Sequence, residues 1–304
     1  FVLNEKGEDR MYHNFSELQD YCNRSHVLLW EAVLKNEIRI THEPKELIYD
    51  RARRRLAIME SAVKKHIARP SEPDGNYIAG MSARQHDHKD NGICGAFINR
   101  VMAYALSCSE ANASMGKVCA APTAGSCGIL PAVLIGMKEE LSLEEETVLN
   151  GFITAGGLGA IITRNATVSG AEGGCQAECG VAAAIAAAAA VQMCGGTAEQ
   201  SIAASGFALM NIMGLVCDPV AGLVQIPCAQ RNASQAVNAL VSADLALAGH
   251  PLLIPMDEIV EAMYQVGRQL PPSLRETAMG GLAATKTGKK MGRCLTEKNL
   301  QAEA

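Results

Sequence analysis

The sequence predicts an all-α protein, and three observations support this fold class. Residues 1 to about 70 are charged and place apolar side chains three and four positions apart, the spacing of amphipathic helices. From Gly92 onward the chain is rich in Ala and Gly and lacks the alternating runs of β-branched and aromatic residues that form strands. Aromatic residues make up only 4% of the 304 residues, whereas hydrophobic residues make up 48%. Small side chains must therefore do most of the packing.

The chain is expected to form a single domain, 1–304, with three regions of different composition. Residues 1–75 are the amphipathic helical part, in which apolar spacing predicts two or three helices. Residues 76–288 are the Ala/Gly-rich core, and residues 289–304 are a polar tail. A loop or hinge is expected at 69–80, where Pro and Gly gather.

Several helix boundaries in the core carry recognisable signals. Ser142 and Thr197 each stand three residues ahead of a Glu or Gln, which is the spacing of a capping box. Both are therefore predicted to begin helices. A further short helix is expected over residues 257–266, ended by Gly267 and the Pro pair that follows.

Four loops look more constrained than the connections between helices require. Each combines Gly or Pro with small polar or sulfur side chains, so that backbone N–H groups can converge on an anion. The alternative is that Gly and Pro merely punctuate helices, but four such loops in one helical chain favour a functional site. The loops are residues 121–128, 165–175, 217–232 and 270–285.

Cysteine spacing alone does not establish a metal site among the eleven cysteines. There is no C-x-x-C pair and no run typical of ferredoxins. Cys175, Cys217 and Cys228 each lie in a Gly- or Pro-bearing loop, which favours a functional role for them. A small buried hydrophobic side chain remains the alternative for each. Cys175 and Cys179 lie one helical turn apart, at the start of an Ala-rich helix.

Composition also limits the partners and the compartment. The net charge is −5 and the basic cluster at residues 51–55 is short, so nucleic acid is not expected as a partner. The apolar run at residues 181–191 is shorter than the roughly 20 residues that span a bilayer, so no membrane is expected either. An odd number of cysteines in a chain of this length favours a reducing cytoplasm over a disulfide framework.

Four segments together resemble the alpha chain of the iron-sulfur-dependent bacterial L-serine dehydratases, also called L-serine ammonia-lyases. The resemblance extends from about Phe15 to Gly288 and implies a helical catalytic domain whose loops converge on a 4Fe-4S cluster. Three cysteines would hold the cluster and leave one iron open. In order, the segments are GKVCAAPTAGSCGILPAVL, SGAEGGCQAECGVAAA, GLVCDPVAGLVQIPCAQRNA and RQLPPSLRETAMGGLAATKTG.

Carried over residue by residue, the cluster ligands match Cys175 in GGCQAE, Cys217 in CDPVAG and Cys228 in IPCAQRN. Cys179 falls where relatives commonly have a residue that does not bind the cluster, so packing is its expected role. The positive end of the helix that begins near Cys175 is expected to point at the anionic cluster.

The reaction implied by the resemblance is β-elimination of water from L-serine, in which the open iron acts as a Lewis acid on the hydroxyl group. A base removes the α-proton, aminoacrylate forms, and tautomerisation and hydrolysis then give pyruvate and ammonia. Pyridoxal phosphate is not expected. Some family members carry a beta domain on a separate polypeptide, and this chain matches only the alpha part. The base is therefore unidentified in this chain and is expected on a separate beta chain, in an oligomer.

The zwitterionic substrate is expected to be held by the first two loops. Thr123, Gly125 and Ser126, helped by Gly173 and Gly174, are expected to receive its carboxylate, because glycine permits close approach and a helix N-terminus favours negative charge. Three weaker candidates, for which a capping or surface role is the alternative, are Asn165, Ser169 and Arg231.

Other polar and sulfur residues are assigned less specific roles. His86 and His88 are expected in a solvated polar loop, and His250 in a turn before Pro251. Cys127 adds a thiol to the predicted substrate loop, which could change its sensitivity to oxidation. Cys294 could approach the cluster as the C-terminal cysteine of single-chain members does, although a polar tail is the alternative.

Other protein classes remain open on the sequence alone. A pyridoxal-phosphate dehydratase would use a Lys such as Lys117 beside a Gly-rich loop, but the alternating strands and helices of that class are missing. A noncatalytic iron-sulfur protein would normally fill all four iron positions. An L-cysteine desulfidase-type lyase would use similar Lewis-acid chemistry with sulfide as the leaving group. A helical scaffold would use the Ala/Gly surfaces for packing alone.

Overall fold

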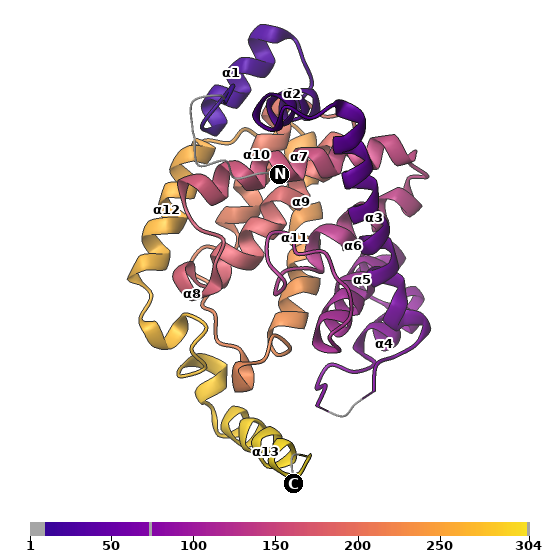
Figure 1. Cartoon of the computed structure of the whole chain (residues 1–304), viewed down its shortest axis with the longest axis vertical. Helices are drawn as coiled ribbons and strands as arrows, with labels where there is room; N and C mark the ends of the chain where they lie inside the picture. Colours follow the sequence, from indigo (N-terminus) through magenta and orange to yellow (C-terminus); the bar gives the residue numbers. More distant parts are fainter. Residues whose placement is uncertain (1–9, 73–74, 303–304) are drawn as a thin grey trace.

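The computed structural model describes residues 10–72 and 75–302, which form a helical bundle (Figure 1). No strand occurs among these residues, and an isolated parallel bridge joins Cys217 to Arg275. The predicted all-α fold is therefore confirmed. In the first half of the chain the α-helices are α1 (Phe15–Ser25), α2 (Leu29–Thr41), α3 (Lys45–Ala68), α4 (Met81–Asp87), α5 (Gly95–Ala113) and α6 (Ile129–Glu140). In the second half they are α7 (Glu145–Asn165), α8 (Gly170–Gly173), α9 (Val181–Met193), α10 (Ala198–Met210), α11 (Cys228–Leu247), α12 (Met256–Gln269) and α13 (Lys286–Ala302).

Helix α9 forms the centre of the bundle (Figure 1). Every residue of its sequence, VAAAIAAAAAVQM, is buried, and it packs against α6, α7, α10 and α11. A helix that is apolar all round must be covered on every side, and its alanines let the neighbouring backbones come close. At Gly151 of α7, a Cβ atom would lie 2.7 Å from Cγ of Met193. A larger residue at this crossing would therefore have to displace the side chain of Met193.

In the part of the chain that the structure describes, residues 176–193 have the length and hydropathy of a membrane-spanning helix. This segment is completely buried inside the bundle. A buried core helix can have the same length and hydropathy as a membrane-spanning helix. Its composition is therefore explained by its central position.

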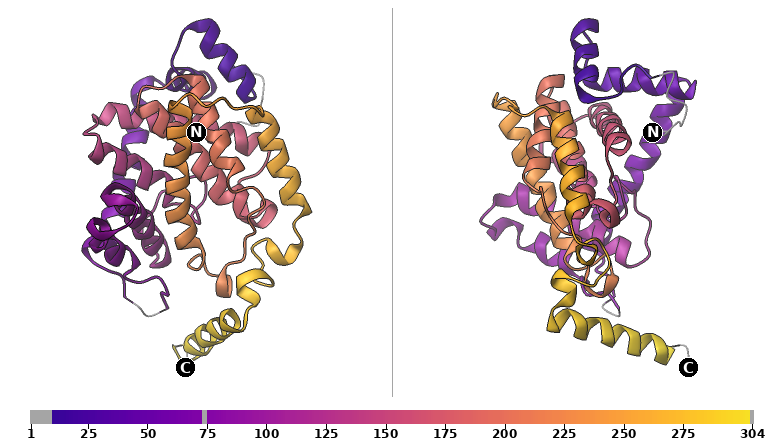
Figure 2. Two further views of the ribbon diagram at one scale, coloured as in Figure 1. Left: turned by 180° about the vertical axis from the view of Figure 1, so that it is seen from behind. Right: turned by 90° about the vertical axis from the view of Figure 1, so that its left-hand side faces the viewer.

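The N-terminal part forms three helices, as the apolar spacing predicts. Helices α1 and α2 lie at one end of the bundle, and α3 runs down its side next to α5 (Figures 1 and 2). The apolar face of α3 contributes fully buried side chains such as Met59 and Val63 to the core. No helix occurs in the described residues between α3 and α4, in agreement with the predicted loop.

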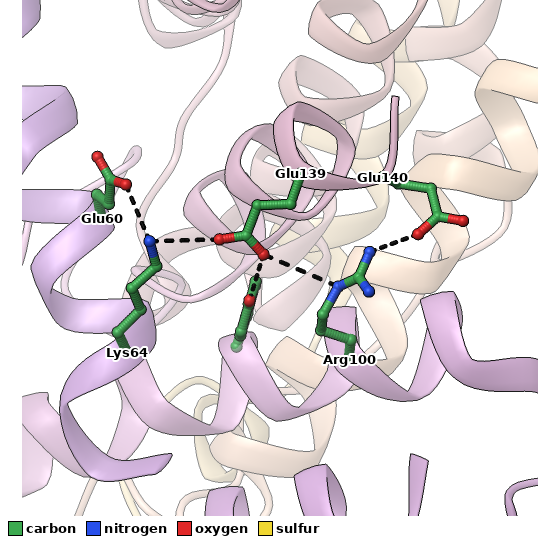
Figure 3. A network of polar contacts seen from close by, with 6 residues as sticks. Glu60, Lys64, Arg100, Glu139 and Glu140 are labelled. Atoms are coloured by element: carbon green, nitrogen blue, oxygen red, sulfur yellow. Dashed lines mark hydrogen bonds and ion pairs between the residues drawn. The ribbon is translucent and has the colours of Figure 1, made fainter. Parts of the chain in front are cut away.

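A network of charged side chains joins α3, α5 and α6 at the surface (Figure 3). Lys64 of α3 pairs with Glu139 of α6, and Arg100 of α5 pairs with Glu139 and Glu140. Partly exposed ion pairs contribute only about 0–1 kcal/mol each. Apolar packing therefore remains the main source of stability where these helices meet.

The prediction that Ser142 caps a helix is wrong. The N-cap of α7 is Glu144, and Ser142 instead has a φ of 52° in the turn that ends α6. The N–H of Leu143 donates to the carbonyl of Lys138 at 3.0 Å. This is the hydrogen bond that closes a helix around a left-handed residue. The short connection thus uses Ser142 to end one helix, and the next begins three residues later. The Thr197 cap of α10 is confirmed, with its capping box to Gln200.

The helix predicted at 257–266 is longer than expected, because α12 continues through Gly267 to Gln269. Gly267 is buried inside the helix, where a Cβ atom would lie 2.7 Å from the Cα of Gly173. This glycine is required for close packing of α12 on α8 and does not end the helix.

The prediction of a solvated loop around His86 is also wrong, because residues 81–87 form α4, which packs on α5. The buried carboxylate of Glu110, on α5, accepts hydrogen bonds from the backbone N–H groups of Gly80 and Ser82 at 3.0 and 2.7 Å. A buried acceptor far along the chain thus stabilises a helix start that local sequence does not reveal.

Helix α13 lies across the predicted boundary at residue 288 and projects from one end of the bundle (Figures 1 and 2). It contacts the short 3₁₀ segments η4 (Val220–Gly222) and η6 (Gly281–Ala284). Cys294 is exposed on this helix.

Candidate functional site

The four loops singled out in the sequence meet around the start of the central helix. A single turn of π-helix, η3 (Gln176–Gly180), leads directly into α9, and Cys175 is its N-cap. Cys228 is the first residue of α11, and Cys217 lies in the extended segment before it. Three cysteines that are far apart in sequence are thereby brought to one region, at the N-terminal ends of two helical segments.

Gln176 fixes the position of the Cys217 loop relative to Cys175. Its side chain is fully buried. The amide oxygen accepts from the N–H of Gly214 at 2.8 Å, and the amide nitrogen donates to the carbonyls of Gly173 and Met263 at 3.0 and 3.1 Å. These bonds join the π-turn, the 214–217 segment and α12. A buried side chain that satisfies three backbone groups is a strong constraint on loop position. No local signal in the sequence distinguishes Gln176 from a solvated side chain.

Asp218 connects the Cys217 segment to α11 and to the fourth loop. Its carboxylate is almost completely buried and accepts from Arg231 at 2.8 Å and from the N–H of Leu282 at 2.7 Å. Arg231 also donates to the carbonyl of Val216 at 2.9 Å. The N–H of Glu276 donates to the carbonyl of Cys217 at 2.7 Å. The fourth loop therefore lies directly against the Cys217 segment.

Asn232 holds the first loop, 121–128, against the start of α11. Its amide nitrogen donates to the carbonyls of Gly125 and Cys228 at 2.7 and 2.8 Å, and its oxygen accepts from the N–H of Gly128 at 2.9 Å. Asn232 is 1% exposed. The only sequence signal for Asn232 and Asp218 was their place in the CDPVAGLVQIPCAQRN segment, beside two predicted ligands.

The three cysteines are buried and influence one another electrostatically. Cys175, Cys217 and Cys228 are 2%, 3% and 7% exposed. Burial and then the charge of Cys175 raise the pKa of Cys228 to about 12, and raise that of Cys217 well above its usual range. The hydrogen bond with Cys179 lowers the pKa of Cys175, with a further contribution from the guanidinium of Arg231. The same hydrogen bond, together with burial, raises the pKa of Cys179.

Within the described residues, no three Cys, His, Asp or Glu side chains are close enough to share a single metal ion. An iron-sulfur cluster places its cysteine ligands on different irons, so it needs thiolates around a larger volume. Three buried thiols, the N-terminal ends of two helical segments and one guanidinium fit an anionic cluster of this kind. The donor set fits soft thiolate chemistry, since no His takes part in it.

The predicted substrate residues of the first loop lie beside this region. The hydroxyl of Thr123 donates to the carboxylate of Glu178, a residue of the π-turn, and lies 3.1 Å from the hydroxyl of Ser126. A Cβ atom on Gly125 would collide with the same carboxylate. The first loop and the π-turn are therefore in close contact. No local signal in the sequence marks Glu178 as part of the site.

Gly173 and Gly174 are constrained by packing. A Cβ on Gly173 would lie 2.7 Å from that of Ala177, and one on Gly174 would lie 2.6 Å from Cδ1 of Leu270. Gly174 also has a φ of 77°, which an L-residue rarely adopts. These glycines let α8 turn sharply into η3, and their predicted contact with substrate stays a prediction.

Three residues were weaker candidates for holding the substrate. Of these, Arg231 lies among the cysteines, whereas the contacts of Asn165 and Ser169 are with backbone groups of other segments or of their own turn. The amide of Asn165 is exposed and donates to the carbonyl of His13 at 3.0 Å, so it fastens the chain before α1 to the end of α7. Ser169 precedes α8, and its carbonyl accepts from the N–H of Gly173 at 2.8 Å. His250 is exposed in a turn, as the sequence predicts.

Cys127 is expected to resist alkylation in the folded protein. Its thiol is 2% exposed and donates toward the carbonyl of Cys108 at 3.8 Å, and burial raises its pKa to about 12. A raised pKa leaves the thiol protonated at neutral and mildly alkaline pH, and the thiolate is the reactive form. Mass spectrometry after brief iodoacetamide treatment should find Cys94 and Cys194, which are exposed, modified before Cys127. Equal labelling of all three would contradict this placement.

Comparison with known proteins finds relatives that match most of the chain. A family model described as "Serine dehydratase alpha chain" matches residues 24–283. The chain is 46% identical to the L-serine dehydratase alpha chain of Peptoniphilus asaccharolyticus, over 93% of this chain and 98% of that one. It is 42% identical to a probable L-serine dehydratase alpha chain of Bacillus subtilis, over 92% of this chain and 94% of that one. With L-serine dehydratase 1 of Escherichia coli the identity is 32%, over 93% of this chain but only 63% of that protein.

Proposed function

The chain belongs to the serine dehydratase alpha-chain family, and on this basis we propose that it is the catalytic alpha chain of a cytoplasmic L-serine ammonia-lyase. It binds a 4Fe-4S cluster through Cys175, Cys217 and Cys228 and works in an oligomer with a separate beta chain. Its product is pyruvate, released together with ammonia.

The observation that carries this proposal is the meeting of three buried cysteines from two separate loops, 165–175 and 217–232. A buried polar side chain lies next to each cysteine in the sequence or bonds to it: Gln176 and Asp218 follow Cys175 and Cys217 and bond to neighbouring segments, and Asn232 donates to the carbonyl of Cys228. Such complete hydrogen bonding constrains the positions of the loops that carry the cysteines. A protein that used these cysteines only as small hydrophobic side chains would not need three buried polar anchors around them.

When bound, the cluster supplies a Lewis acid for the departing hydroxyl group of serine. The residues of this chain position it and enclose it. The N-terminal ends of the segments that start at Gln176 and Cys228 place positive dipole ends beside the thiolates. Arg231, held by Asp218, adds a full positive charge. Burial lowers the pKa of Arg231, but the charges of Cys175 and Asp218 outweigh burial and raise it, so this charge is retained.

The substrate lies between the cysteines and the first loop, where Thr123, Gly125 and Ser126 are proposed to meet its carboxylate. Loss of the α-proton to a base and of the β-hydroxyl group as water gives aminoacrylate, whose imine tautomer hydrolyses to pyruvate and ammonia. We assign the base to the beta chain. The alpha chain then holds the substrate while its partner completes the site.

The proposal is tested by purifying the chain anaerobically together with its beta chain and assaying pyruvate from L-serine without added pyridoxal phosphate. The complex should be brown, form pyruvate, and lose both colour and activity together on exposure to air. The alpha chain alone should keep the colour but not the activity. Full activity in a colourless, iron-free complex would refute the proposal. L-Cysteine is the control substrate. A desulfidase would release sulfide from L-cysteine faster than it forms pyruvate from L-serine, whereas a serine ammonia-lyase should show the opposite order.

A further inference from the structure

Glu178 is a buried carboxylate that no cation in the described chain neutralises. It is 8% exposed, and one of its oxygens, Oε1, accepts the hydroxyl of Thr123. Among the side chains that the structure describes, no Lys, Arg or His forms an ion pair with it, and the nearby carboxylate that affects it is Glu276. A buried charge without a partner is costly, so such a group normally has one in the functional complex.

The second oxygen of Glu178 faces the region of the cysteines. A Cβ atom built on Gly170 would lie 3.3 Å from this Oε2, 3.3 Å from Oε2 of Glu276 and 3.0 Å from Sγ of Cys217. The two carboxylates and the thiol therefore surround the same small space, which Gly170 leaves open. Glu276 reaches it from a backbone with a φ of 63°, held by its hydrogen bond to the carbonyl of Cys217.

We propose that Glu178, with Glu276 facing it, binds the α-ammonium group of the amino-acid substrate. The proposal rests on the proposed function, since the cation is that of the substrate itself. The ammonium and carboxylate groups of an amino acid are attached to one carbon. An ammonium on Glu178 therefore places the substrate carboxylate next to loop 121–128, and the side chain toward Cys217.

This assignment explains two further features. The raised pKa of Glu178, caused by burial and by Glu276 and only partly offset by Thr123, is what is expected of a carboxylate whose countercharge arrives with a ligand. The hydroxyl of Thr123 orients the carboxylate, because it occupies Oε1 and leaves Oε2 free. Thr123 is then a positioning residue for the ammonium site.

The test compares two ligands that differ only in the proposed group. L-Alanine keeps the ammonium and has no leaving group, whereas L-lactate has a hydroxyl in its place. Calorimetric titration of the anaerobic holoenzyme should show L-alanine binding on the order of 100-fold more tightly, the usual worth of a hydrogen bond to a charged group. In Glu178→Gln, which keeps size and an acceptor for Thr123, this preference should disappear while iron and sulfide contents remain unchanged.

Glu172→Gln is the matched control, because Glu172 also accepts a threonine hydroxyl, that of Thr167 at 2.6 Å, but is exposed on α8. This variant should keep the preference. Thr123→Val should lower affinity for L-alanine several-fold more than that for L-lactate, because the carboxylate contact is common to both ligands whereas Glu178 acts on the ammonium alone. This variant tests the site even if Glu178→Gln does not fold.

An unchanged preference in Glu178→Gln, or equal losses of both ligands in Thr123→Val, would overturn the ammonium site. The wild-type complex is assayed in parallel for pyruvate. Pyruvate formation together with an unchanged ligand preference refutes only the role of Glu178, whereas no pyruvate from the wild type refutes the proposed function.

Discussion

Replacing Cys175, Cys217 or Cys228 by Ser is expected to abolish retention of the cluster and formation of pyruvate. Each of these residues would bind a different iron, and a hydroxyl is a poor substitute for a thiolate as a ligand to iron-sulfur centres. Loss of a Lewis acid that contributes several kcal/mol lowers the rate by about a thousandfold or more. Iron and sulfide analysis of anaerobically purified variants, with a pyruvate assay, measures both effects.

Cys22 and Cys108 provide the controls, because both are buried and lie on helices α1 and α5, outside the four loops. Their replacement by Ser should leave iron content unchanged and cost only the stability expected of a buried polar group. If all five variants lost iron to the same extent, the three cysteines would not be specific ligands.

Replacing Asp218 by Asn is expected to destabilise the protein by about 3 kcal/mol, because it leaves the charge of Arg231 buried without its partner. The side chains of this pair are only 14% and 4% exposed, so solvent screening does little to reduce the penalty. The same change weakens the hydrogen bond from the N–H of Leu282. It therefore loosens the contact between loops 217–232 and 270–285. Thermal unfolding of the anaerobic holoenzyme should show a lower melting temperature, and iron content should fall.

The control is Glu145→Gln, which breaks an ion pair with Arg53 whose side chains are 52% and 58% exposed. Exposed pairs of this type contribute about 0.2–1 kcal/mol. A melting temperature that changes equally in the two variants would mean that the Asp218–Arg231 pair has no special role in the site.

Much of the fold follows from local patterns in the sequence. The Ala-rich run of α9 has no polar face, which predicts its central position, and the amphipathic spacing of residues 17–68 predicts the helices that cover the core. The Thr197 capping box can also be predicted from the local sequence, because Thr197 and Gln200 lie within one helical turn. Ser142 and Gly267 were misassigned because residues suited to a helix end also serve other geometries. A tight turn and a close helix crossing decide their roles, and both depend on neighbours.

Some residues of the candidate site are also indicated by the sequence, whereas others are recognised only in the structure. The family resemblance of the four segments selected Cys175, Cys217 and Cys228, and their role as ligands remains a prediction. Local patterns did not identify Gln176, Glu178 or Asp218 as important, because a Gln, Glu or Asp in a loop is normally solvated. These side chains form part of the site because they are buried. Their burial depends on residues far along the chain, as in the hydrogen bond from Gln176 to Met263, 87 positions away.

The sequence by itself therefore determined the helical class, the Ala-rich centre and the four constrained loops, two of which carry Cys175, Cys217 and Cys228, because each is encoded within a few consecutive residues. Tertiary structure alone decided that Asp218 and Asn232 hold these loops together, and that the carboxyl group of Glu178 is buried beside that of Glu276. The physical reason is that hydrogen bonds and desolvation depend on distance in space. Residues 121–128, 175–178 and 217–232 are neighbours only in the folded bundle.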